Sequence, residues 1–394
     1  MEIIPLDDHE RPAGPAVNRL EDWYQALRKK IVDQGSEVTV TEDQLSLASI
    51  ECIRAFSREP DCDFVFQAMD KAYLDRMNDE SGDEHLHLLV FPPCDRSNRV
   101  ASWAEMHGMD ILTAPDRSEL LSRDRAEVNL PVGQGPLVIP KLEDWFVRHR
   151  QGLRHIRALL SALQNTSRSC LVSCSSWTWI YLKKSVNADL VLPAPDSLAP
   201  MNADSLGEWL LSLLSEQSDQ SITFRDHSDG KELLRRSEDG TFSEDFMAQL
   251  ADDSAGIPWI AWQLWRRSLR TEAERADQVE ESEQEADEAD EVDKQQEAES
   301  KTTVFWVVRG QPPTLPRGHE RAACLVLQAL LIHGSLPDEI LGSVLPSIGE
   351  SNLVVALIRS GFIERHDGAL RCLATAYPVI WTTLSNSGMT MAHF

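Results

Sequence analysis

Short apolar segments alternate with helical patterns between residues 86 and 192, and this alternation constrains the fold more than any other feature of the sequence. The segments are LHLLVF (86–91), DIL (110–112), PLVI (136–139), SCLVSC (169–174) and ADLVL (188–192). Strands separated by helices form crossover units, and crossover units build a mainly parallel sheet. We therefore predict an α/β domain over residues 85–200.

The first of these strands runs into a turn and a helix, an arrangement in which many proteins grip a phosphate. A P-loop, G-x-x-x-x-G-K-[ST], needs glycines for backbone approach, a lysine for the terminal phosphates and a hydroxyl for magnesium. Aligned on the Pro92-Pro93 turn, its four defining positions hold Phe91, Arg96, Ser97 and Asn98. Side chains would fill the place of the phosphates, and the lysine charge is missing.

The second half of such a site is a strand that ends in one acid for magnesium and another that activates water. Here the strand PLVI runs into Pro140 and Lys141 at those two positions. Proline offers no oxygen to a metal, and a charged lysine cannot accept a proton. The residues therefore predict no catalytic group, no metal and no required cofactor.

The order of the segments resembles bacterial AAA/STAND-type P-loop ATPases with a C-terminal winged helix, over residues 85 to about 390. The likeness rests on this turn, on KLEDWF (141–146), on SCLVSCSSWTWIYL (169–182), on VLPAPDSLAPMNADSLGEWL (191–210) and on GIPWIAWQLWRRSL (256–269). The resemblance implies a nucleotide-sensing position near Ser173, Ser175 or Ser176 and an adenine-side position near residues 256–258. Because the departures fall on catalytic positions, it implies a pseudo-ATPase. An unrelated α/β turn and an active hydrolase are the alternatives.

The whole chain is expected to hold five regions. They are an N-terminal helical region (1–84, with an amphipathic helix at 18–35), the α/β domain (85–200), a helical lid (201–270), an acidic run (271–300) and a winged helix-turn-helix domain (301–394). The last is read from helices at 320–334, 337–345 and 350–361, followed by two strands around His366-Asp367-Gly368. The acidic run is interpreted as a disordered linker or as a solvated extension of the preceding helix.

Three tryptophans in the lid, Trp259, Trp262 and Trp265, recur at helical spacing. They are interpreted mainly as core, with an exposed patch for a partner or a lid contact as the alternative. The basic segment WRRSLR (265–270) either neutralises the acidic run or caps its own helix.

Two further clusters of residues are weaker candidates for a functional site. His85 and His87 alternate on a strand and share a side, as metal ligands would, but strand-edge histidines are the favoured interpretation. A hydrolytic triad could be assembled from Asp144, His149 and Ser173. The sequence lacks the G-x-S-x-G turn that usually carries the nucleophile, so this hypothesis is disfavoured.

Charge and cysteine content limit the partners and the compartment. The net charge is −26, and residues 272–299 hold fourteen acids against Arg275 and Lys294, which disfavours nucleic acid and anionic lipid as partners. The third predicted helix, 350–361, also offers few cations to a DNA groove. Seven cysteines without a C-x-x-C pair, no leader pattern and no run of about 18 apolar residues favour a cytoplasmic protein without a membrane span.

These observations favour a non-catalytic, ATPase-like scaffold or regulatory subunit. Its expected partner is a protein, such as an active ATPase relative or a membrane-associated complex, and an oligomer is compatible with the sequence. The alternatives are a DNA-binding regulator acting through the winged helix, and an ATPase with a divergent nucleotide site.

Overall fold

A computed structural model describes most of the chain. The residues described are 1–12, 45–49, 53, 57, 60, 63–78, 85–95, 97–122, 126–214, 222–227, 230–235, 242, 245–272, 303–308, 312–348 and 351–392. They belong to two compact units, each built from separate stretches of chain. The first unit comprises residues 1–11, 61–200 and 312–394, and the second comprises residues 12–60 and 201–311. The predicted helix at 18–35 and nearly all of the acidic run lie outside the described residues.

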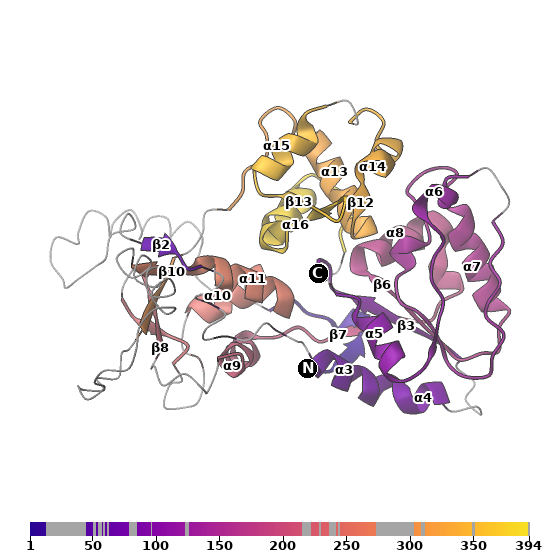
Figure 1. Cartoon of the computed structure of the whole chain (residues 1–394), viewed down its shortest axis with the longest axis horizontal. Coiled ribbons are helices and arrows are strands. Elements are labelled where there is room, and N and C mark those ends of the chain that lie inside the picture. The colour runs from indigo at the N-terminus through magenta and orange to yellow at the C-terminus, as the bar shows by residue number, and fades with distance from the viewer. Residues whose placement is uncertain are drawn as a thin grey trace, which may run out of the picture. The chain divides into compact units, whose positions relative to one another are not determined.

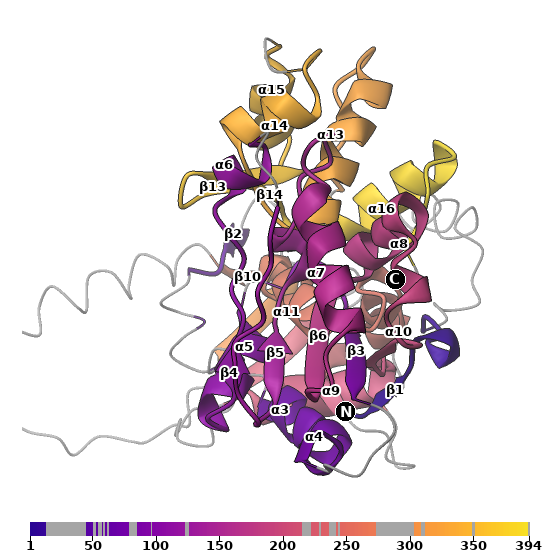
Figure 2. The same cartoon turned by 90° about the vertical axis from the view of Figure 1, so that its right-hand side faces the viewer.

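A six-stranded sheet forms the centre of the first unit. Its strands, in spatial order, are β1 (Ile3–Pro5), β7 (Asp196–Leu198), β3 (Leu86–Phe91), β6 (Cys170–Ser175), β5 (Leu137–Ile139) and β4 (Asp110–Ile111). All neighbours are parallel except β1, which pairs antiparallel with β7. Figure 2 shows β4, β5, β6 and β3 side by side in this order. The prediction of an α/β fold with a mainly parallel sheet is therefore confirmed.

One predicted strand is wrong, and two strands of this sheet were not predicted. Residues 188–192 begin with a 3-10 turn, Ala188–Leu190, because Asn187 adopts a left-handed conformation (φ 52°) and ends the preceding helix. The fifth parallel strand is β7 instead. The region 1–84, predicted as helical, supplies strand β1 at its start.

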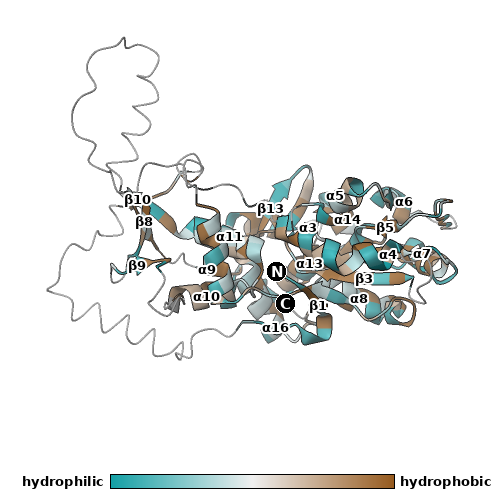
Figure 3. Ribbon diagram, turned by 90° about the horizontal axis from the view of Figure 1, so that it is seen from below, coloured by the Kyte–Doolittle hydropathy of each residue, from teal (hydrophilic) through white to brown (hydrophobic). Residues whose placement is uncertain are grey.

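Helices connect and cover these strands. They are α3 (Asp63–Met69), α4 (Asp75–Asn78), α5 (Arg99–Met106), α6 (Arg117–Leu120), α7 (Arg154–Gln164) and α8 (Ser176–Val186). Helix α7 buries Ile156, Leu159, Leu160 and Leu163, while arginine, histidine and glutamine stand among its other positions. Its ribbon in Figure 3 accordingly bears both hydrophobic and hydrophilic colours, as expected for a helix with one face in the core.

The C-terminal module, defined as residues 312–392, belongs to the first unit. Its elements are α13 (Glu320–His333), β12 (Leu336–Pro337), α14 (Asp338–Val344), α15 (Leu353–Arg359), β13 (Ile363–His366), β14 (Ala369–Cys372) and α16 (Tyr377–Asn386), shown in orange and yellow in Figure 1. The predicted hairpin is present, with Asp367 and Gly368 both at positive φ in its turn. Helix α13 packs against α8, so this module is part of the sheet's own unit rather than a separate domain from residue 301.

The second unit is not the purely helical lid that the sequence predicted. Its helices α9 (Ala203–Ser212), α10 (Asp245–Asp253) and α11 (Pro258–Ser268) accompany a five-stranded sheet. That sheet has the order β2 (Leu45–Leu47), β10 (Leu269–Glu272), β11 (Thr303–Val307), β8 (Ile222–Asp226), β9 (Glu232–Leu233). The apolar and β-branched segment 303–307 pairs with β8 and β10, which explains why it does not begin the C-terminal module.

The tryptophans of α11 are buried side chains. Trp259, Trp262 and Trp265 are 7%, 4% and 1% exposed, and the rings of Trp265 and Phe224 lie 5.3 Å apart. They are core residues, and the alternative of an exposed partner patch is wrong. The helix ends at Ser268, so Leu269 and Arg270 of the basic segment lie in strand β10. Within the described part of the chain, no helix is long and apolar enough to cross a membrane.

Candidate functional site

The carboxyl ends of β3, β5 and β6 open into a cavity of about 180 Å³ in the first unit. In open α/β sheets, ligands bind at this edge, where the strand order reverses. The cavity is smaller than the range of about 300–1,000 Å³ that is usual for small-molecule sites. Three groups of residues line it: residues 91–95, 97 and 98 of the turn with the start of α5, the segment after β5 with the end of β6, and residues 330, 331 and 333–335 with Arg371 and Cys372 of the C-terminal module.

The turn after β3 is closed by a carboxylate of its own. One oxygen of Asp95 accepts hydrogen bonds from the backbone N–H and the hydroxyl of Ser97, each at 3.0 Å. The same oxygen pairs with Arg99, and both charged side chains are at most 16% exposed. An acid thus occupies the donors that a phosphate would use at the start of a helix. The positive charge of Arg99, at the start of α5, is neutralised by the same acid.

The segment after β5 brings Glu143 to the sheet edge, two positions beyond Lys141. A carboxylate oxygen of Glu143 accepts the backbone N–H of Ser175 at 3.3 Å. Burial, and then the negative charge of Asp144, raise the pKa of Glu143 to about 7. Lys141 and Pro140 line the cavity, and neither supplies an oxygen ligand from its side chain.

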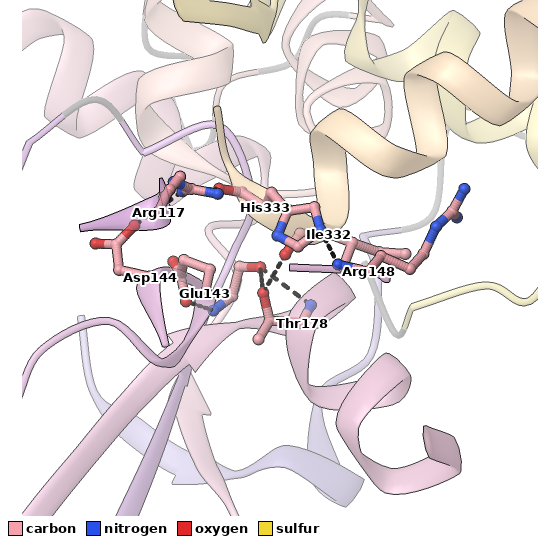
Figure 4. A network of polar contacts seen from close by, with 8 residues as sticks. Arg117, Glu143, Asp144, Arg148, Thr178, Ile332 and His333 are labelled. Carbon is pink, nitrogen blue, oxygen red and sulfur yellow. Dashed lines mark hydrogen bonds and ion pairs between the residues drawn. The ribbon is translucent and has the colours of Figure 1, made fainter. Parts of the chain in front are cut away.

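His333, the last residue of α13, closes this edge from the other side (Figure 4). Its side chain is 1% exposed, and its ring centre lies 4.8 Å from that of Phe146. Its Nε2 accepts the backbone N–H of Arg148 at 3.1 Å, which requires an unprotonated nitrogen. Burial, with the charges of Arg117 and Arg148 nearby, holds the pKa of His333 well below its usual range. The ring is therefore neutral at physiological pH.

Buried hydroxyl groups complete the contact between α13 and the sheet. Thr178, fully buried in the first turn of α8, donates to the backbone oxygen of Ile332 at 2.6 Å and contacts the Ser175 hydroxyl at 2.9 Å. Ser175 in turn caps α8 by accepting the backbone N–H of Thr178. Helix α13 thus ends on the polar residues that follow β6, and the Ser175 hydroxyl faces inward to Thr178.

One ion pair and two hydrogen bonds surround this core. Arg117 pairs with Asp144 at 2.9 Å and also donates to the backbone oxygen of His333 at 3.3 Å. Farther along, the indole N–H of Trp177 donates to the hydroxyl of Tyr377 at 3.1 Å, and both side chains are fully buried. Contacts from α6, α8 and the segment after β5 therefore converge on the C-terminal module.

The structure brings together most, but not all, of the sequence-predicted positions. Phe91, Ser97, Asn98, Pro140 and Lys141 line the cavity with Ser173 and Ser175, whereas Arg96 lies outside the described residues and Ser176 is buried beside the cavity. Residues 256–258 belong to the second unit.

The weaker clusters are not assembled. Asp144 pairs with Arg117, and His149 accepts the backbone N–H of Gln151 at 3.3 Å, so no triad with Ser173 forms. His87 is 4% exposed and packs on Tyr73. Among the described residues, no group of three or more His, Cys, Asp or Glu side chains could hold a metal ion.

Several residues that decide the site were missed from the sequence. Asp95 had a local signal, because an acid two residues before a serine and four before an arginine at a helix start is typical of a self-capped turn. His333 and Thr178 had none, since their partners lie far away in the chain. Glu143 was visible in KLEDWF, but its pKa depends on burial that only the fold reveals.

No family model and no curated protein matches the chain. Among solved structures, a point variant of RuvB from Thermotoga maritima has a TM-score of 0.28 and 11% identity, over 88% of this chain and 96% of that one. Cdc6p from Pyrobaculum aerophilum has a TM-score of 0.26 and 11% identity, over 90% of this chain and 100% of that one. Superpositions this loose carry no property of either protein to this chain. The site itself defines an α/β protein whose sheet edge is closed by its own side chains.

Proposed function

We propose that this protein is a non-catalytic, ATPase-like scaffold or regulatory subunit that binds a protein partner. The observation that carries the proposal is the closure of the sheet edge by Asp95 on one side and by α13 with His333 on the other. A triphosphate with its metal would have to displace both, and it would find no acidic side chain at Pro140 or Lys141.

The C-terminal module supports the same proposal. Its order of three helices and a hairpin is that of a winged helix, in which the third helix, α15, would enter a DNA groove. Helix α15 carries one basic residue, Arg359, and its exposed or half-exposed positions include Val354, Val355 and Ile358. Such a helix neutralises few phosphates and suits contact with protein better.

Nucleotide titration tests the proposal directly. Calorimetry with Mg·ATP should give no binding isotherm, and phosphate release should stay at the buffer rate for the wild type. Lys141→Ala serves as the matched control, because a true active site would respond to loss of the cation that lines the cavity. Magnesium-dependent turnover that Lys141→Ala reduces would overturn the proposal in favour of a divergent ATPase.

Partner class is tested with the full chain as bait, beside a chain that lacks residues 271–300. A retained protein that reconstitutes a stoichiometric complex from purified components supports the scaffold role. Specific retention of a labelled DNA duplex, with a steep salt dependence, would instead support the DNA-binding alternative.

A further inference from the structure

One stretch of the first unit departs from the acidic character of the chain. Residues 145–188 contain no Asp or Glu, although 64 of the 394 residues of the chain are acidic. The same stretch holds five arginines, two lysines and two histidines. It spans the segment after β5, helix α7, strand β6 and helix α8. A chain of net charge −26 thus carries a surplus of positive charge in one part of the sheet unit.

Four of these cations, Arg148, Arg150, Arg157 and Lys184, are defined as the basic patch. Arg150, Arg157 and Lys184 are exposed, and Arg148 is half-buried. Among the residues that the structure describes, none of the four forms an ion pair with a carboxylate, whereas other arginines of the same unit do. Those arginines are Arg99, Arg117, Arg168, Arg365 and Arg371. Like charges that stand together repel one another, so the patch raises the energy of the free protein.

Hydrogen bonds connect Arg148 to Lys184. The Arg148 guanidinium donates to the amide oxygen of Gln328 in α13 at 3.4 Å. Gln328 donates to the backbone oxygen of Thr390 at 3.4 Å, and Lys184 donates to the hydroxyl of the same residue at 3.2 Å. The side chain of Arg148 extends away from His333 in Figure 4. Both cations therefore meet around Gln328 and Thr390, outside the closed sheet edge.

The other two cations lie on the same face of the sheet. The connections β5–α7–β6 and β6–α8–β7 run in the same direction across the sheet, so right-handed crossovers place α7 and α8 on one face. Phe146, two residues before Arg148, stacks its ring on that of Tyr181 in α8 at 5.3 Å. Burial raises the pKa of Tyr181, and the charges of Arg148 and Arg157 oppose this rise, as expected of two cations near one hydroxyl.

The loop 147–152 holds Arg148 and Arg150 in a fixed conformation. The backbone N–H of Val147 donates to the oxygen of Gly152 at 3.1 Å, and the N–H of Gly152 donates to the oxygen of His149 at 3.0 Å. A Cβ atom at Gly152 would collide with the Val147 oxygen, so the loop requires glycine there. A loop that is already ordered loses little conformational entropy when it binds a ligand.

We propose that the basic patch binds an acidic segment of a protein partner, one rich in Asp and Glu. The inference rests on the proposed function, because it gives the chemistry of the partner. Arginine side chains bind carboxylates through two parallel hydrogen bonds, and several such pairs offset the repulsion within the patch. A short acidic peptide covers the patch alone, whereas a nucleic-acid duplex or an anionic membrane extends over the surrounding acidic surface, which repels it.

The test measures binding of a fluorescein-labelled peptide of repeated Glu-Ser-Asp-Gly units to the full-length protein, by fluorescence anisotropy at physiological ionic strength. We expect saturable binding that weakens as salt is added, and no binding of the same peptide with Gln and Asn in place of its acids. Arg150→Glu combined with Arg157→Glu should weaken binding by about tenfold.

The matched control is Arg317→Glu combined with Arg359→Glu, which makes the same change of net charge at exposed sites of the C-terminal module. Its affinity should stay within about twofold of the wild type, because salt screens distant charges. Circular dichroism checks the fold of each variant, and a patch variant that misfolds is replaced by Arg150→Gln combined with Arg157→Gln.

Three results would overturn the proposal: no saturable binding by the wild type, equal losses in the two double variants, or tighter binding of a single-stranded oligonucleotide of equal charge. The acidic run of the chain itself is the remaining occupant. A chain shortened only within residues 274–300, outside β10 and β11, should bind the peptide as the full chain does. A gain of about tenfold would instead assign the patch to that run.

Failure of this inference is distinguishable from failure of the proposed function. Magnesium-dependent ATP turnover would overturn the proposed function and leave the anisotropy result unchanged. Absence of peptide binding would remove the basic patch as the partner surface, while the nucleotide titration would still support a non-catalytic scaffold.

Discussion

The two sides of the cavity are closed in different ways. At the turn after β3, Asp95 binds Ser97 and Arg99, all within five residues of sequence. At the ends of β5 and β6, closure comes from His333 and Ile332, which lie more than 150 residues beyond their partners Arg148 and Thr178. The first closure is a property of the loop, whereas the second is a property of the fold.

This difference has consequences for stability and for what each side can do. The turn can keep its shape while the C-terminal module moves, because its hydrogen bonds are internal. The ends of β5 and β6 depend on α13, so an event that loosens the module exposes Glu143 and leaves the backbone N–H of Arg148 without its acceptor. Mutations on the two sides should therefore separate local from module-wide effects.

Removal of the Asp95 charge should have the largest effect. Asp95→Asn removes the negative charge that pairs with the Arg99 guanidinium, whose side chain is 10% exposed, which should cost about 3 kcal/mol of unfolding free energy. The measurement is urea unfolding at pH 7.5. Asp189→Asn, at an exposed site, is the matched control and should change stability by less than about 0.5 kcal/mol. Equal losses in the two variants would show that the turn is not held by this ion pair.

Replacement of His333 tests the distant closure and its pH dependence. His333→Leu removes the acceptor of the Arg148 N–H and the contact with Phe146, which should cost about 2–3 kcal/mol at pH 7.5. Because the pKa of His333 is lower in the folded protein than its usual value of about 6.5, the unfolded chain binds the proton first as pH falls. The wild type should therefore lose stability below about pH 6.5, by at most about 1.4 kcal/mol per pH unit from this residue.

The His333→Leu variant should lack this part of the pH dependence, so its deficit should shrink toward acid pH. His319→Leu, an exposed position before α13, provides the control. An unchanged pH profile in His333→Leu would mean that His333 does not stay neutral in the folded protein.

The same contrast explains what could be predicted from the sequence. Strands β3, β5 and β6 lie within one or two residues of the apolar runs that predicted them, because a buried strand must be apolar on both faces. Strand β7 was missed because Asp196 and Ser197 are polar, and their hydrogen bonds to Tyr73 and to the backbone of Val90 are what allow them into the sheet. The turn closed by Asp95 could have been predicted from its local sequence. The position of His333 could not be predicted, because no local pattern indicates where the end of a helix will pack.

The predicted domain boundaries differ from those of the structure for a similar reason. Strand β11 pairs with β8 across some eighty residues of sequence, so the second unit assembles around a segment that looks like the start of the C-terminal module. Likewise, Ile3–Pro5 joins the sheet only by pairing with β7. Pairings at such separation are set by the tertiary fold, which local periodicity does not encode.

A smaller loss should follow from removal of the buried hydroxyl that links β6 to α13. Thr178→Val preserves the shape of the side chain. It removes the donor to the Ile332 oxygen and the partner of the Ser175 hydroxyl, which should lower the free energy of unfolding by about 1–2 kcal/mol. Thr382→Val is the matched control, because its hydroxyl donates to a helix oxygen at an exposed site. Thermal unfolding of the two variants should differ in midpoint, and a shared midpoint would contradict the buried contact.

Glu143 should give a pH dependence of stability opposite in sign to that of His333. Its folded pKa of about 7 lies above its ordinary value of 4.5, so its contribution to stability is full below about pH 4.5 and is lost as pH rises through 7. Glu143→Gln carries no charge and should be more stable than the wild type at pH 8.5 by about 1 kcal/mol, with little difference at pH 5. Unfolding free energies at the two pH values measure the effect, with the exposed Glu339→Gln as the control. A gain of equal size at both pH values would rule out ionisation as its cause.

The smallest effect should come from the backbone of the turn itself. Because Cys94 has φ 61°, a Cβ atom there is strained, and Cys94→Gly should exceed Cys94→Ala in stability by about 1 kcal/mol. Both variants lack the thiol, so their difference isolates the backbone term from any sulfur chemistry. Chemical unfolding under reducing conditions gives the comparison, and Leu190→Gly against Leu190→Ala, at an exposed position in the turn after α8, should show the reverse order. If alanine were the more stable at residue 94 as well, the turn would not hold its left-handed conformation in solution, and the closure by Asp95 would lose its geometric basis.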